Sequence, residues 1–395
     1  MTFFDTLAAA FKGGGGAARV PLSAGPPMRH AAALGAPPPA ERFDYTTALE
    51  EAFARNAVAQ RAIRIVAEGV GSAPLTVTPE PVAALFGKGA SGGPLLETLA
   101  AHLLLHGNAW AQIVRDGAGM PVALCPLRPE RMEVVPGADG WPVAARYHLP
   151  SDTREMPLED AQGWPALVHW RALHPANDHY GGGCLSAAHQ AVAIHNAASA
   201  WNRALLENAA RPSGALIYRG EDAGGLTREQ FDRLSEELTQ AFAGERNAGR
   251  PMLLEGGLSW QSLSLSPADM DFATLKAAAA RDIALAFGVP PMLLGLPGDN
   301  TYSNYREANR ALWRLTLLPL ADKLLSGLAD AMTPWFPDAR LEVDLDRVPA
   351  LAEDRERLWA QVASADFLTR AEKRDLLGLP PIADGAAATN PEVQP

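Results

Sequence analysis

Two long alanine-rich segments that border an insert constrain the fold of this chain more than any other feature. Residues 184–210 contain ten alanines, and a second alanine-rich segment covers residues 267–288 and stops before Pro290 and Pro291. Alanine has the highest helix propensity, and the first segment would span about 40 Å as a helix. Small side chains let helices approach closely, so both segments predict helices that pack against neighbours.

The insert and the segment after it have their own patterns. Residues 211–266 predict a small α/β unit with a strand at GALIYR, a helix that begins near Thr227, and strands at PMLLE and LSWQSLSL. Residues 303–332 predict a third long helix. Pro319 should kink it, because proline removes the bond to the Leu315 carbonyl and clashes with that turn.

The regions outside these helices predict a mixed α+β fold. A helix is expected over Glu50–Glu68, a strand at Leu75 and Val77, a helix closed by Gly107, and a strand meander over 108–148. The strand ALVHW follows, and residues 349–380 predict two short helices. The Gly-, Ala- and Pro-rich start at 1–40 and the tail at 381–395 are expected to be disordered.

Composition excludes several functions. Lys and Arg total 34 and Asp and Glu total 45, a net charge of −11, which argues against a protein that grips DNA phosphates. Cys125 and Cys184 are too few and too far apart for a disulfide scaffold or a zinc site. We see no secretory signal and no apolar run long enough to span a bilayer.

Three motifs contain residue types that could carry chemistry. Gly89–Gly93 matches the GxSxG nucleophile elbow around Ser91, but the preceding residues do not form a convincing strand, so a plain loop is favoured. His174 and His179 lie in a Gly- and Pro-rich loop, which favours a solvated loop over a metal site. Glu342, Asp344 and Asp346 alternate, which predicts an acidic row on one strand face that can be solvated or bind a cation.

Specific strings resemble the portal proteins of long-tailed bacteriophages. One is the turn Gly107-Asn108-Ala109-Trp110 followed by a Leu-x-Pro-Leu-x-Pro pattern that begins at Leu124. The other is RDIALAFGVPPMLLG followed by TYSNYREANRALWRLTLLPL. The resemblance covers roughly residues 45–345, and its general character is similar to the portals of gene transfer agents.

The resemblance implies an α+β portal fold. Its parts are an N-terminal arm (1–40), a wing (41–183), a stem of two helices (184–210 and 267–289), a clip (211–266), a tunnel loop (290–302), a tunnel helix that completes the wing (303–348), a crown (349–380) and a tail (381–395). The segment after 349 is short for a crown.

It also implies a function without catalysis, cofactor or metal. Twelve copies would form a ring at one capsid vertex of a virion or gene transfer agent, which is assembled in the bacterial cytoplasm. Double-stranded DNA would enter and leave through this ring without sequence-specific contacts. Partners would be the major capsid protein, the terminase large subunit and a head–tail adaptor, with no membrane. The alternatives are a serine hydrolase that uses Ser91 and a ring adaptor without a channel.

Three groups of residues are candidates for this role. The tunnel loop would contact DNA through Leu294, Gly295, Pro297, Gly298, Asp299, Asn300, Thr301 and Tyr302. The clip would contact partners through Glu229, Arg233, Glu236 and Glu237. The stem would pack through Ala277, Ala278, Ala279 and Ala280.

Overall fold

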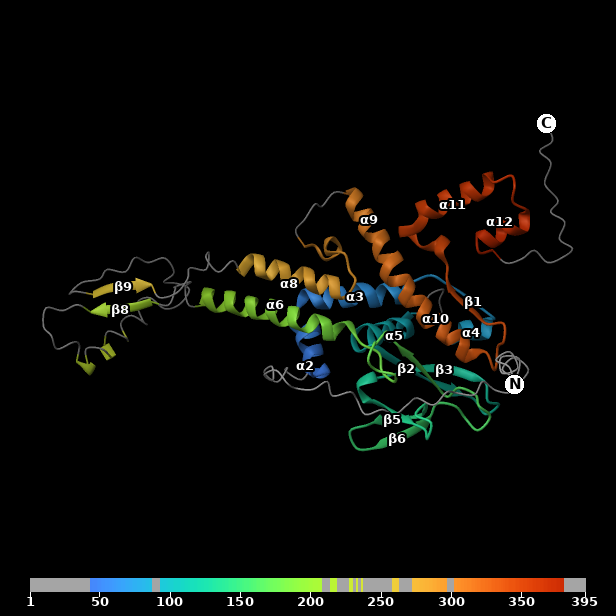
Figure 1. Ribbon diagram of the computed structural model, residues 1–395, viewed down its shortest axis with the longest axis horizontal. Helices are drawn as coiled ribbons and strands as arrows, with labels where there is room; N and C mark the ends of the chain where they lie inside the picture. The colour runs from blue at the N-terminus through green and yellow to red at the C-terminus, as the bar shows by residue number, and fades with distance from the viewer. Residues whose placement is uncertain are drawn as a thin grey trace, which may run out of the picture.

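The computed structural model describes residues 43–86, 93–207, 214–218, 227–229, 232–233, 236, 258–262, 272–296 and 302–379. Figure 1 shows a mixed α+β protein in which a pair of helices projects from a body of helices and small sheets. Within these ranges every helix is too short or too polar to cross a membrane. The predicted arm and tail lie outside the described residues.

The first helical region breaks at Asn56. The chain forms α2 (Tyr45–Leu49), the π-helix η1 (Glu50–Ala54) and then α3 (Ala57–Gly71). Asn56 has an extended backbone, and its side-chain oxygen accepts a hydrogen bond from the Ala59 N–H at 3.0 Å. It is therefore the N-cap of α3. The prediction of one helix over Glu50–Glu68 is wrong, because this cap starts a new helix inside that range.

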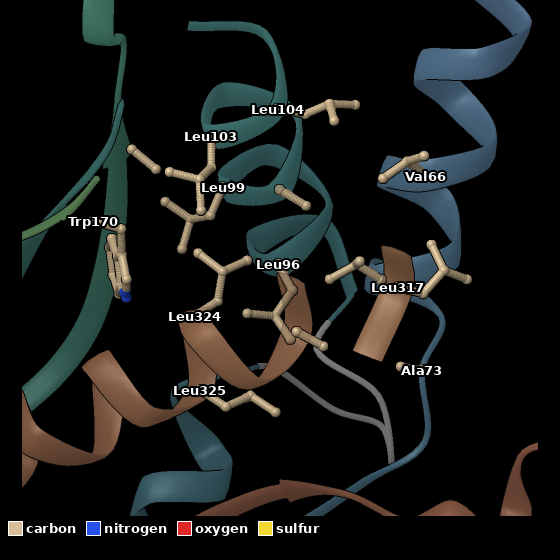
Figure 2. Close-up of a cluster of buried hydrophobic side chains, with 14 of the residues drawn as sticks. Val66, Ala73, Leu96, Leu99, Leu103, Leu104, Trp170, Leu317, Leu324 and Leu325 are labelled. Atoms are coloured by element: carbon tan, nitrogen blue, oxygen red, sulfur yellow. The ribbon is translucent and has the colours of Figure 1, made fainter. Parts of the chain in front are cut away.

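The core lies where α5 (Gly93–His106) packs between α3 and α10 (Leu318–Met332). Figure 2 shows side chains from these helices and from strand β7 (Leu167–Arg171) meeting there: Val66, Leu96, Leu99, Trp170, Leu324 and Leu325. Each fully buried leucine contributes about 1.5–3 kcal/mol. The predicted leucine-rich helix is confirmed, and Gly107 follows it with a φ of 81°.

Residues 108–171 form two three-stranded antiparallel sheets. The first has the order β3-β2-β7 and the second the order β4-β5-β6. Their strands are β2 (Asn108–Arg115), β3 (Pro121–Leu127), β4 (Met132–Pro136), β5 (Pro142–His148) and β6 (Thr153–Pro157). The predicted meander is wrong between β3 and β4. Pro129 lies in that connection and has no N–H to continue a ladder, and the 3-10 turn η2 (Pro129–Arg131) leads the chain into a second sheet.

A small sheet joins distant parts of the chain. The predicted strand at Leu75 and Val77 is confirmed as β1 (Leu75–Thr78), which pairs antiparallel with β10 (Arg340–Val343). The short helix α4 (Glu80–Ala84) follows β1. The body is therefore built from the first and last parts of the described chain.

The projecting pair consists of the two alanine-rich helices. They are α6 (Cys184–Glu207) and α8 (Phe272–Ala286), which pack against each other in opposite directions (Figure 1). Over these residues both predicted helices are confirmed. Two predicted strands are also confirmed, as the antiparallel pair β8 (Gly214–Tyr218) and β9 (Leu258–Ser262) beyond the far end of the helices.

The third long helix contains a π-helical turn before its proline. It consists of α9 (Tyr302–Leu312), η5 (Trp313–Leu317) and α10. The Leu318 N–H bonds to the Trp313 carbonyl, five residues earlier. The wider turn makes room for the Pro319 ring, which cannot continue the regular ladder. The irregularity predicted at Pro319 thus takes the form of a π-turn.

The C-terminal part forms the two short helices expected there. Two 3-10 turns, η6 (Leu345–Arg347) and η7 (Pro349–Leu351), lead into α11 (Ala352–Ser364) and α12 (Arg370–Leu376). Ion pairs tie α11 to α9, because Arg310 lies 3.1 Å from Glu353 and 3.3 Å from Asp354.

Candidate functional site

The candidate site is the base of the projecting helices, where α6 and α8 meet α3, α5 and the turn before α9. The contact between α6 and α8 is made mostly of small side chains. The buried residues on the two helices are Leu185, Ala188, Val192 and Ala198 on α6 and Ala279, Ala280, Ile283 and Ala284 on α8. Alanines at these positions let the two backbones approach closely, as the sequence predicts.

The four candidate packing alanines do not share one environment. Ala279 and Ala280 are buried within the chain, whereas Ala277 is half-buried and Ala278 is exposed. Contacts within one chain therefore use Ala279 and Ala280. Ala278 is available to a second molecule.

Glycines attach α6 to the body. A Cβ atom at Gly183 would lie 2.0 Å from the Leu105 carbonyl oxygen, and one at Gly181 would lie 2.0 Å from the Gly107 carbonyl oxygen. No side chain fits at such distances, so only glycine allows this approach. The segment before α6 is thus held directly against the backbone at the end of α5.

The side-chain amide of Asn108 holds the same segment. Its oxygen accepts the Gly181 N–H at 2.8 Å, and its nitrogen donates to the Gly181 carbonyl at 3.2 Å. The amide also contacts His169 Nε2 and His106 Nδ1, each at 3.1 Å. Asn108 is 1% exposed, so these partners replace water completely. This role of Asn108 is not evident from the motif that contains it, although a polar residue that opens an apolar strand is a signal for it.

The histidines around Asn108 are held neutral. Burial, followed by the charge of Arg171, lowers the pKa of His169 to about 3, and its ring stacks on Trp110 with centroids 3.6 Å apart. Burial lowers the pKa of His102 to about 4 and also lowers that of His106. The ring of Tyr45 packs edge-on against His106. The imidazoles of the junction are therefore uncharged at neutral pH, and those of His106 and His169 are hydrogen-bonded to Asn108.

A second set of amides attaches the other flank of α6. Asn56, the cap of α3, donates to the Asn196 side-chain oxygen at 2.9 Å, and Asn196 donates to the Glu51 carbonyl at 3.2 Å. His195 lies beside them, 3.1 Å from the Asn56 nitrogen. Burial and then the charge of Lys276 lower its pKa. α6 is thus fixed to η1 and α3 as well as to α5.

The turn after α8 contains the described part of the predicted tunnel loop. Gly288 has a φ of 65°, and its carbonyl accepts a hydrogen bond from the Thr316 hydroxyl at 2.7 Å. The chain then enters the 3-10 turn η4 (Pro291–Leu294), where Leu294 is half-buried, and leaves it through Gly295 with a φ of 72°. Residues 297–301 lie outside the described residues, and Tyr302 opens α9.

The predicted clip contacts are described in part. Glu229, Arg233 and Glu236 are helical and exposed. Glu237 lies outside the described residues.

The GxSxG, histidine and acidic motifs form no reactive arrangement in the described ranges. Ser91 itself lies outside them, but helix α4 precedes its motif, whereas the nucleophile elbow needs a strand. His174 accepts a hydrogen bond from the Ala176 N–H within its loop. No group of three or more potential metal ligands occurs among the described residues.

The acidic row predicted at Glu342, Asp344 and Asp346 does not form. Strand β10 ends at Val343, and Asp344 caps the turn that follows. Asp346 faces Arg355 at 2.5 Å, and hydrogen bonding to that guanidinium lowers its pKa. The three acidic residues would share one face only if strand β10 continued to residue 346, but the strand ends at Val343.

The fold indicates the class of protein to which the chain belongs. It matches that of an HK97 family phage portal protein from Corynebacterium diphtheriae, with a TM-score of 0.53, 19% identity, and coverage of 76% of this chain and 98% of that chain. The family model for phage portal proteins matches residues 57–378. The chain belongs to the phage portal protein family. Members of this family are structural proteins and not enzymes.

Individual relatives agree with this membership. A chain in the neck of a native gene transfer agent particle, a structure computed with C12 symmetry, is 47% identical with a TM-score of 0.66 and coverage of 86% of this chain and 94% of that one. A Rickettsia felis protein is 40% identical over 352 residues, covering 85% of this chain and 89% of its own. The portal protein of Enterobacteria phage HK97 is 25% identical over 302 residues, and the match covers 74% of this chain and 67% of that protein.

Proposed function

We propose that twelve copies of this chain form a ring at one vertex of a virion or gene transfer agent capsid, and that DNA enters and leaves through the ring. Family membership and the similarity to a chain from a neck with C12 symmetry support this function. The observation that carries it is the projecting pair of alanine-rich helices with a strand pair at its far end.

Each part of the fold then takes a role. α6 and α8 form the stem, residues 211–266 form the clip, and residues 41–183 with 303–348 form the wing. Residues 290–302 form the tunnel loop, and α11 and α12 form a small crown. The glycine and Asn108 contacts at the base set the angle at which the stem leaves the wing, because they fix α6 on α5 and β2.

The DNA path uses weak contacts. The tunnel loop from Leu294 to Tyr302 contains an aspartate and no lysine or arginine, and the chain has a net charge of −11. Duplex DNA carries one negative charge per about 1.7 Å, so strong phosphate binding would slow its movement. A loop without basic residues suits a channel in which DNA slides without being read in sequence.

The outer surfaces of the ring bind the partner proteins. Exposed charges on the clip helix, among them Glu229, Arg233 and Glu236, face the terminase large subunit during filling and the head–tail adaptor afterwards. The wing contacts the major capsid protein.

Electron microscopy of the purified full-length chain tests this function. We expect rings with an axial hole and a native mass close to twelve times the 41.9 kDa of one chain. A monomer would contradict the proposal, and a ring without a hole would indicate an adaptor instead. A hydrolase is tested by Ser91→Ala, which should leave rings and particle yield unchanged.

A further inference from the structure

An apolar groove at the end of α8 is left open by the described residues. It has a volume of about 390 Å³ and lies between the last turns of α8, the turn η4 and the π-helical turn η5. Leu285 and Leu315 line it and are 79% and 77% exposed. Pro290 and Pro291 extend the same apolar lining. Contiguous exposed apolar surface of this kind is typical of an interaction site.

The first twelve residues of the chain, which lie outside the described ranges, carry an apolar pattern that the proposed function does not use. Their sequence is MTFFDTLAAAFK, in which Phe4, Leu7 and Phe11 are spaced i, i+3 and i+7. This spacing places three large apolar side chains on one side of a helix. Amphipathic helices that bind apolar grooves present their anchoring residues at this spacing.

The same twelve residues favour a helix that forms only against a partner surface. Leucine, lysine and the three alanines at 8–10 have high helix propensity, and Gly13 is a typical residue after a helix end. Isolated helices shorter than about 12–15 residues are marginal in water. A segment of this length therefore gains stable helical structure when its apolar side is covered.

The described chain begins close to the groove. The ring of Phe43 packs edge-on against His189 on α6, with centroids 5.6 Å apart. Because α6 and α8 run in opposite directions, the first turns of α6 lie at the level of the last turns of α8, which line the groove (Figure 1). The start of the described chain and the groove are therefore both at the base of the two helices.

The chain between the apolar segment and Phe43 has the length needed to reach the groove. α2 and α8 lie on opposite sides of α6, so the connection crosses two packed helices, about 20 Å at 8–10 Å for each helix (Figure 1). Residues 13–42 are rich in Gly, Ala and Pro. A linker of this length has a root-mean-square end-to-end distance of about 30 Å, so it spans the distance without being stretched.

The charges of the segment and the groove are compatible. Arg281 and Asp282 are the charged residues that line the groove, and Asp5 and Lys12 are the charged residues of the segment. Asp5 and Lys12 are seven residues apart, which places them on one side of a helix, next to the apolar side. Each sign of charge on the segment thus has its opposite at the groove.

We propose that residues 3–11 form a helix that seats Phe4, Leu7 and Phe11 in the groove of the same chain, against Leu285 and Leu315. The linker raises the local concentration of the segment, so a contact that is weak for a free peptide stays occupied. The bound helix lies beside the prolines at 290–291, which begin the proposed tunnel loop, and restrains the start of that loop. The contact forms within one chain and does not depend on the ring.

Disulfide trapping in the full-length chain tests the pairing. Phe4→Cys and Leu315→Cys are combined with Cys125→Ser, which removes an exposed native thiol. After mild oxidation we expect tryptic peptide 1–12 to be joined to tryptic peptide 315–323 in the monomer band of a non-reducing gel. The matched control carries Leu173→Cys in place of Leu315→Cys, because Leu173 is 87% exposed but lies outside the groove. We expect the yield at Leu315→Cys to be at least fivefold higher than in the control.

Peptide binding gives a second measurement. A full-length chain with Leu7→Asp cannot seat its own segment, so its groove is open to a fluorescently labelled peptide of residues 1–12. We expect saturable binding in fluorescence anisotropy, and we expect the added substitution Leu315→Asp to weaken it at least tenfold. Leu173→Asp should leave binding unchanged. Both substitutions replace exposed side chains, so the circular dichroism spectrum should stay that of the parent.

Three results would overturn the proposal. Equal trapping at Leu315→Cys and Leu173→Cys would show that the segment has no preference for the groove. Peptide binding that survives Leu315→Asp would place the peptide elsewhere. Cross-links found only between chains would show that the groove receives a neighbouring copy instead of the segment of its own chain. A wild-type chain that forms no ring would count against the proposed function alone, because trapping within one chain is measured whether or not rings form.

Discussion

The amide of Asn108 provides the sharpest test of how α6 is attached to the body. Replacing Asn108 with alanine leaves the buried Gly181 N–H and carbonyl without their partners and removes the contacts to His106 and His169. A buried polar group without a partner costs about 1–3 kcal/mol. Because two backbone groups of Gly181 are affected and some water can enter the space, we expect a loss of about 2–4 kcal/mol in the free energy of unfolding.

Two measurements check this value. Urea denaturation gives the free energy of unfolding, and hydrogen exchange reports the Gly181 amide directly, which should exchange faster in the variant than amides of the α5 core. Gln190→Ala removes an amide from an exposed position of α6 and should change stability by no more than about 0.5 kcal/mol. If Asn108→Ala matches Gln190→Ala in stability and Gly181 keeps its protection, the assigned role of the amide is refuted.

Four further predictions concern the junction, the tunnel loop and the clip. The free energy of unfolding should fall as the pH drops below about 6.5, because His102 and His169 have pKa values of about 4 and 3 in the fold, whereas the same histidines in the unfolded chain bind protons near 6.5. Urea midpoints measured between pH 7 and 4 check this. His169→Gln should make the stability less dependent on pH. Gly183→Ala should cost more than about 3 kcal/mol or prevent folding, as measured by thermal unfolding, because its Cβ would meet the Leu105 oxygen, whereas Gly117→Ala, with open space around it, should fold normally. Deleting Gly295–Asn300 should leave rings visible by electron microscopy but impair DNA packaging, and full packaging would contradict the channel role. Reversing Glu236 and Glu237 to lysine should keep the fold and lower the yield of filled or tailed particles, and an unchanged yield would count against the clip assignment.

Helices α6 and α8 were predictable from sequence because their signals are local. Alanine content, the stop at Pro290 and Pro291, and the proline within the third helix each act within a few residues. The same holds for α5, whose leucine spacing and closing Gly107 mark both its buried side and its end.

The errors arose where distant residues decide the structure. The split into two sheets depends on β7 returning to pair with β2, which places His169 opposite Trp110. The acidic row failed because pairing with β1 stops at Val343, and the role of Asn108 depends on a glycine 73 residues further along. The break at Asn56 is different, because an asparagine before an apolar helical pattern is a local cap signal that the helix prediction passed over.

The pairing of β1 with β10 has a consequence for how the chain is made and how it can change. The body closes only when residues 340–343 reach residues 75–78, so it cannot be completed on the ribosome before α6 and α8 have been synthesised. The segment from Cys184 to Ala286 leaves the body and returns to it at the same place, at the base of α6 and α8 (Figure 1). A segment whose two ends are fixed in this way can change its distal part in sequence or length while the geometry of the base is preserved.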